Sequence, residues 1–167
     1  SYATLGKLVR EGKVSEAKVD LAVRRMLETE MTRAFVRQVK PAQIKALKAH
    51  ITAEKKAMDR NDVGQRTELL GDFHVVMAEQ MGNHVLAQIL GELLSRCALI
   101  TLMYQSASAA EHSHEEHEAI VTALAAKDEA LAVRLMQEHL QHVEEGLTFD
   151  RDMPSSDLSM ALSGIAA

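Results

Sequence analysis

The chain has 167 residues, of which 47% are hydrophobic and 26% are charged, a balance that suits one globular domain with a sizeable core. Its net charge of −5 excludes a broad basic surface for nucleic acid, and its single cysteine excludes an internal disulfide framework and suits the cytoplasm. The longest apolar run, 97–103, is too short to span a bilayer, so no membrane partner is expected.

Apolar residues recur at helical spacing along most of the chain and predict about six helices. Pro41 suits the first turn of the second helix, Gly82-Asn83 is a stop signal after the third, and Lys127-Asp128 separates the last two. The predicted helices cover 15–39, 41–58, 65–81, 85–104, 111–126 and 129–146, with a loop over 105–109. No segment alternates with period two for long enough to be a strand. The sequence therefore predicts an all-α antiparallel bundle joined by short turns.

Three histidines lie on apolar lines of three different predicted helices: His74 on the third, His117 on the fifth and His139 on the sixth. Each could be an ordinary core residue satisfied by a hydrogen bond, since an unpaired buried imidazole is costly. Neutral imidazole is also the commonest protein ligand for transition metals, and three histidines with an open fourth position form a known zinc arrangement. The spacing therefore leaves two interpretations, separate core histidines or one shared metal ion. His114 is a further candidate ligand, because it lies three residues before His117.

Arg24 and Arg96 are the charged residues that we most readily place near the interior of the bundle. One interpretation is a guanidinium at the surface whose aliphatic stem packs on apolar neighbours. The other is a bidentate clamp on the carboxylate of a bound ligand. Glu28 lies four residues after Arg24, so we expect it to be the structural partner of Arg24 rather than a catalytic acid.

Several short segments stand in one characteristic order along the chain. They are Arg-x-x-Leu-Glu over 24–28, Pro-Ala-Gln-Ile over 41–44, Phe-His at 73–74, Gly-Asn at 82–83, His-x-Ala-Ile over 117–120, Lys-Asp at 127–128 and Met-x-x-His over 136–139. None is specific alone, but the ordered set resembles the effector-binding domain, called the FCD domain, of GntR-type bacterial transcription regulators of the FadR subfamily. The resemblance covers about residues 15–147 and implies an all-helical bundle with a central cavity.

The resemblance also implies that the cavity holds a divalent metal, zinc or nickel, with His74, His117 and His139 as its ligands. The remaining ligand in the family is an Asp, less often Asn, four residues before the first histidine, and here that position is Leu70. Water, the carboxylate of a bound effector or His114 would then complete the metal's coordination. Without the acidic ligand, the metal would bind more weakly or be absent.

The family's effector is expected to be a small organic acid, which would bind the open metal position and contact Arg24 or Arg96. Members of this family carry an N-terminal winged helix-turn-helix domain, and they bind DNA as homodimers. We therefore expect 1–14 to be the connection from such a domain, 15–147 to be the FCD-like domain, and 148–167 to be a tail.

Two other functions fit the same pattern. Three histidines and an open position can activate water in a metal-dependent enzyme, although no evident general base stands at helical spacing from them. The chain could also be a purely structural or dimerising bundle, with each histidine satisfied by other side chains. We expect a non-enzymatic regulator.

Overall fold

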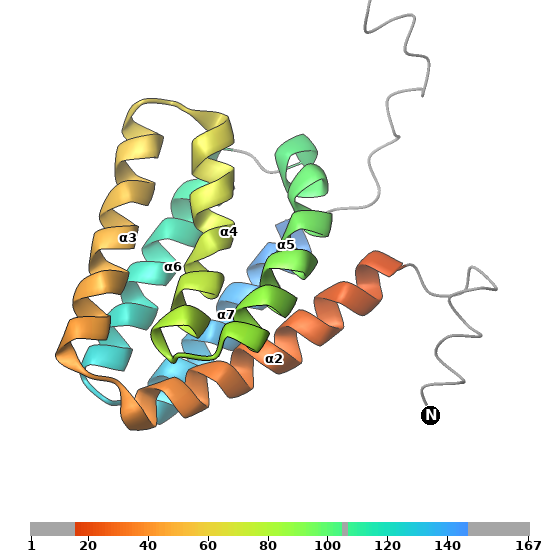
Figure 1. Ribbon diagram of the computed structural model, residues 1–167. Coiled ribbons are helices and arrows are strands. Elements are labelled where there is room, and N and C mark those ends of the chain that lie inside the picture. Colours follow the sequence, from red (N-terminus) through yellow and green to blue (C-terminus); the bar gives the residue numbers. More distant parts are fainter. Residues whose placement is uncertain (1–15, 105–106, 147–167) are drawn as a thin grey trace, which may run out of the picture.

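The computed structural model describes residues 16–104 and 107–146 of the chain. Within these ranges every regular element is a helix, which confirms the all-α prediction (Figure 1). None of the described helices is long and apolar enough to cross a membrane. The helices are α2 (Glu16–Gln38), α3 (Pro41–Asp59), α4 (Val63–Gln80), α5 (His84–Tyr104), α6 (Ala107–Ala125) and α7 (Glu129–Gly146).

The helices form a bundle in which α6 has several neighbours. Helix α6 packs against α3, α4 and α7, while α4 also packs against α5 and α2 lies along α7. In Figure 1, α3 and α4 stand in front of α6 and α7, and α2 runs along the lower side of the bundle. Side chains from α3, α4, α6 and α7 can therefore meet at one place in the interior.

Short turns with capping side chains precede α4, α5 and α7. The side chains of Asp62, Asn83 and Asp128 each accept a hydrogen bond from the backbone N–H three residues later, at 2.9 to 3.0 Å, and so begin α4, α5 and α7. Gly82 has a φ of 74°, a left-handed conformation that glycine adopts without steric cost. The stop signal at Gly82-Asn83 and the break at Lys127-Asp128 are confirmed.

The predicted loop over 105–109 is wrong in its second half, because α6 begins at Ala107. Residues 107–110 are Ala-Ser-Ala-Ala, and alanine has the highest helix propensity of any residue. The polar residues around this point suggested a turn, but the alanines extend the helix by one more turn at its start. Residues 105 and 106 lie outside the described part of the chain.

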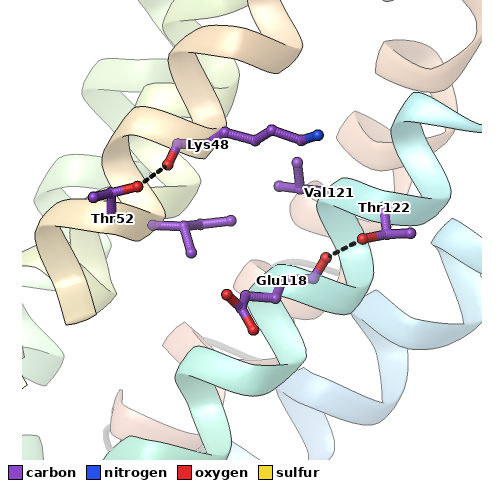
Figure 2. Close-up of a pocket in the computed structure, with 6 residues that line it drawn as sticks. Lys48, Thr52, Glu118, Val121 and Thr122 are labelled. Atoms are coloured by element: carbon purple, nitrogen blue, oxygen red, sulfur yellow. Dashed lines mark hydrogen bonds between the residues drawn. The ribbon is translucent and has the colours of Figure 1, made fainter.

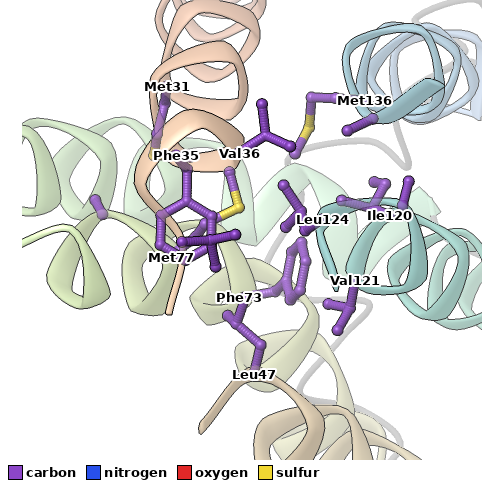
Figure 3. Close-up of a cluster of buried hydrophobic side chains, with 14 of the residues drawn as sticks. Met31, Phe35, Val36, Leu47, Phe73, Met77, Ile120, Val121, Leu124 and Met136 are labelled. Atoms are coloured by element: carbon purple, nitrogen blue, oxygen red, sulfur yellow. The ribbon is translucent and has the colours of Figure 1, made fainter. Parts of the chain in front are cut away.

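The apolar core contains side chains from all six described helices (Figure 3). Its fully buried side chains include Phe35, Leu47, Phe73, Met77, Ile120, Leu124 and Met136. Burying a side chain of this size stabilises the fold by about 1.5–3 kcal/mol. Phe73 also stacks on the ring of His117, with centroids 3.9 Å apart, so the core borders directly on a group of buried ionisable side chains.

Candidate metal centre

The structure brings the three predicted histidines together. His74 comes from α4, His117 from α6 and His139 from α7, and none is more than 2% exposed. The Nε2 atom of His139 lies 3.3 Å from Nε2 of His117 and 3.3 Å from Nε2 of His74. One ligand nitrogen of each histidine lies within 4.8 Å of the other two. Three helices thus direct three imidazole nitrogens at one buried point.

A glutamate faces the outer nitrogen of each imidazole. The Nδ1 atom of His74 lies 2.8 Å from Glu28 Oε2 on α2, and that of His117 lies 2.9 Å from Glu54 Oε1 on α3. His139 Nδ1 lies 2.7 Å from Glu116 Oε2 on α6. These six residues are named here the histidine–glutamate cluster. When Nδ1–H donates to a carboxylate, as the contacts of His117 and His139 allow, the lone pair of Nε2 is left facing inward, as in most metal-ligating histidines.

The donor set at the centre of the cluster suits a metal ion. Because His139 Nε2 faces two other ring nitrogens at once, a single N–H can bridge only one of the two pairs. Nitrogens bound to one tetrahedral zinc ion, at about 2.0–2.1 Å, lie about 3.3 Å from each other. The three imidazoles therefore fit a small divalent transition metal in both chemistry and spacing.

The surroundings keep two of these imidazoles in the neutral form that binds metals. Burial is the largest cause that lowers the pKa of His74, although Glu28 opposes it. Burial also lowers the pKa of His117 well below its ordinary value, and the nearby His139 and His74 lower it further. Near neutral pH, His74 and His117 are therefore uncharged.

The charge of Glu28, the glutamate in contact with His74, depends on Arg24. Burial raises the pKa of Glu28, but the charge and hydrogen bond of Arg24, together with the contact with His74, outweigh it and lower that pKa to about 2. The Nε–H of Arg24 donates to Glu28 Oε1 at 2.9 Å, and both side chains are almost completely buried. The prediction that Glu28 is the structural partner of Arg24 is confirmed, and Glu28 also contacts His74.

Glu54 is the opposite case. It is fully buried among imidazoles, with His114 Nδ1 2.9 Å from Oε2, His117 Nδ1 2.9 Å from Oε1 and His50 Nε2 3.6 Å from Oε1. Burial is the largest cause that raises its pKa, to about 9, and the charge of Glu118 adds to it. A protonated Glu54 can donate through one oxygen to His114 and accept through the other from His117. Both contacts are then satisfied without a buried charge.

Each of the other predicted ligand-contact residues contacts an acidic side chain. Arg24 is interior as predicted, at 4% exposed, and its guanidinium meets Glu28. For Arg96 the structure agrees with the surface interpretation rather than the interior one: its side chain is 57% exposed and forms a bidentate pair with Asp20, at 2.9 Å for both bonds. His114 is buried against Glu54 rather than at the central point. The proposed contacts of all three with a metal or ligand stay predictions.

Two pockets lie between α3 and α6. The larger, of about 410 Å³, is lined by Lys48, Ile51 and Thr52 from α3 and by Glu118, Val121 and Thr122 from α6 (Figure 2). The smaller, of about 190 Å³, is lined by Lys55, Glu111, His114, Glu115 and Glu118. Because His114 lines the smaller pocket and also contacts Glu54, it connects that pocket to the histidine–glutamate cluster. The predicted central cavity stays a prediction.

Sequence reasoning missed Glu54 and Glu116. Glu54 could have been found, because it stands at the helical spacing of Leu47, Ile51 and Met58, the line that marks the buried face of α3. Glu116 has no such signal, since it lies beside the apolar line of α6 and is positioned by its contacts with α7.

Comparisons with known proteins agree with the helical fold described above. The family model of the FCD domain matches residues 20–142. Among solved structures, E. coli McbR/YncC aligns with a TM-score of 0.68 at 19% sequence identity, over 78% of this chain. That identity shows a shared fold alone, and the chain spans 66% of the length of that protein. No curated protein sequence matches the chain.

Proposed function

Because this chain belongs to the FCD domain family, we propose that it is the effector-sensing domain of a GntR-type transcription regulator. In this proposal residues 15–147 are the sensing domain, 1–14 connect it to a DNA-binding winged helix-turn-helix domain, and 148–167 are a tail. The regulator acts as a homodimer, as expected for a winged helix-turn-helix protein that reads two half-sites. The family match and the helical fold support this assignment.

The observation that carries the proposal is the convergence of the Nε2 atoms of His74, His117 and His139, each imidazole backed by a glutamate. We assign these three nitrogens as the ligands of one divalent metal, zinc or nickel. Such an ion, held by three imidazoles, offers an open position for a carboxylate or water oxygen. Leu70, 7% exposed and one turn before His74, supplies no ligand there.

The effector in this proposal is a small organic acid whose carboxylate takes the open position. Arg24 is paired with Glu28, and Glu116 contacts His139. In this proposal Arg24 has two roles: it keeps Glu28 ionised beside His74, and its positive charge attracts an anionic ligand. Arg96, paired with Asp20 at the surface, is a weaker candidate for ligand contact.

The cluster connects the helix nearest the N-terminal connection with the centre of the bundle. Its members come from α2, α3, α4, α6 and α7, and Glu28 ties α2 to His74. A ligand that moves one imidazole therefore also biases the position of α2, which begins at Glu16, close to the proposed connection over 1–14. Coupling between effector and DNA sites is typically worth about 1–3 kcal/mol.

We propose a regulatory rather than a catalytic role. Each glutamate of the cluster already holds an imidazole, so none of these three carboxylates is placed as a separate general base. A screen for hydrolase activity on zinc-loaded protein tests this directly: turnover that is lost in His139→Ala would favour the enzyme alternative.

Thermal unfolding with added ligands tests the sensing function. Zinc or nickel, and then a panel of small carboxylic acids in the presence of the metal, should raise the melting temperature of chelator-treated protein. A ligand at about 100 times its Kd stabilises the native state by about 2.7 kcal/mol. His84→Ala, at an exposed histidine, is the matched control and should respond like the wild type. Protein that no metal and no acid stabilises would contradict the proposal.

A further inference from the structure

A second group of side chains with metal-ligating chemistry lies at the surface where α6 and α7 meet. His112 and Glu116 are four residues apart on α6, and His142 comes from α7. His112 Nε2 lies 3.1 Å from Glu116 Oε1, and His142 Nδ1 contacts the same oxygen. One ligand atom from each of the three lies within 4.8 Å of the other two.

This group differs from an ordinary surface ion pair in its arrangement. Two imidazoles from different helices converge on one carboxylate oxygen, with ring centroids 5.2 Å apart and ring planes tilted by 50°. Glu116 is held in place from its other side, because its second oxygen contacts His139 Nδ1 at 2.7 Å. The carboxylate is therefore positioned by the interior, and the two helices fix the backbone of all three residues.

We infer that His112, Glu116 and His142 form a second binding site for a divalent transition metal, at the surface and separate from the three buried histidines. Two imidazole nitrogens and one carboxylate oxygen are ligands that zinc, nickel and copper all accept. The site is open to solvent, since the side chains of His112 and His142 are 55% and 45% exposed. Water or a further ligand completes the coordination.

The exposure of the site predicts a weaker affinity than that of a closed structural metal site. A metal binds the unprotonated ring nitrogen of a histidine, so its affinity for this site should fall as pH is lowered. Glu116 also contacts His139 of the buried site through its second oxygen, which makes Glu116 unsuitable for a clean test. His112 and His142 can be replaced without touching a ligand of the buried site.

Zinc binding to the full chain tests the inference. After chelator treatment, equilibrium dialysis against zinc chloride near neutral pH should give two bound equivalents in the wild type. The double variant H112A/H142A should lose the weaker equivalent, and each single variant should weaken it by about tenfold or more. His84→Ala, also an exposed histidine, should keep both equivalents. The conservative pair H112Q/H142Q repeats the test with side chains that keep more of the surface packing.

The outcome separates this site from the buried one. Loss of an equivalent in H112A/H142A supports the surface site, even if H74A/H139A binds as much zinc as the wild type and the proposed buried site fails. A double variant that binds zinc with the same stoichiometry and affinities as the wild type overturns the inference, whatever the buried histidines do.

Discussion

Two buried glutamates of the same cluster each contact a histidine, but one is ionised near neutral pH and the other is protonated. Glu28, on the α2 side, meets the guanidinium of Arg24 and has a pKa of about 2. Glu54, on the α3 side, meets imidazoles and has a pKa of about 9. Burial raises the pKa of both carboxyls, so the difference comes from the partner. The permanently charged guanidinium of Arg24 keeps the buried carboxyl of Glu28 ionised, whereas the neutral imidazoles around Glu54 leave its carboxyl protonated.

The two glutamates therefore make the stability of the protein depend on pH in opposite directions. Between about pH 2 and its ordinary pKa of 4.5, Glu28 binds fewer protons in the native state than in the unfolded state, so its contribution is lost as the pH falls. Glu54 binds more protons in the native state between 4.5 and about 9, so stability falls as the pH rises through that window. Glu28 on α2 therefore limits the stability of the protein in acid, and Glu54 on α3 limits it in base.

The largest expected effect comes from removing the cation on the α2 side. Arg24→Met removes the cation that keeps Glu28 ionised, so the buried carboxylate is left unpaired or must take up a proton, which should lower the free energy of unfolding by roughly 3–5 kcal/mol. Arg96→Met is the matched control, because its pair with Asp20 is exposed and should cost at most about 1 kcal/mol. Urea denaturation of both variants measures the difference. Equal losses in the two variants would show that Arg24 does not sustain the charge of Glu28.

A middle-sized effect is expected on the α3 side. In chelator-treated protein, Glu54→Gln removes a carboxyl that the native state keeps protonated, so the variant should lack the decline in stability between pH 4.5 and about 9. Compared with the wild type, it should gain about 1–3 kcal/mol between about pH 6 and about pH 8. Urea denaturation at the two pH values provides the measurement. Parallel pH profiles for variant and wild type would mean that Glu54 is ionised like Glu28.

The smallest effect concerns Glu118, whose charge adds to burial in raising the pKa of Glu54. The side chain of Glu118 is 62% exposed, so solvent screens its charge. Glu118→Gln should therefore lower the pKa of Glu54 slightly and stabilise the protein near pH 8 by less than about 1 kcal/mol. Glu115→Gln, at another exposed glutamate of the same pocket, is the comparison. A loss of stability in the Glu118 variant alone would contradict the assigned repulsion.

The sequence alone predicted the three histidines that α4, α6 and α7 contribute to this cluster. His74, His117 and His139 stand on apolar lines, and an apolar line predicts an inward direction because helical periodicity fixes the face. The same rule would have revealed Glu54, whose position on the buried line of α3 is occupied by an acid instead of an aliphatic residue.

Other features depended on contacts between distant parts of the chain. Arg96 looked interior from the spacing of its helix, but Asp20 on α2 holds it at the surface. Glu116 gains its role only because α7 brings His139 and His142 to its two oxygens. The difference in pKa between Glu28 and Glu54 likewise depends on tertiary partners that no local pattern contains.

Anomalous diffraction from crystals grown with zinc tests most directly whether His74, His117 and His139 share one metal ion. We expect one strong anomalous peak at about 2.0–2.1 Å from each of the three Nε2 atoms, with an oxygen of water or a carboxylate completing the site. The same crystals of His139→Ala should lose that peak. Wild-type crystals with no anomalous density between the three nitrogens, at zinc concentrations that saturate the protein in solution, would contradict the assignment.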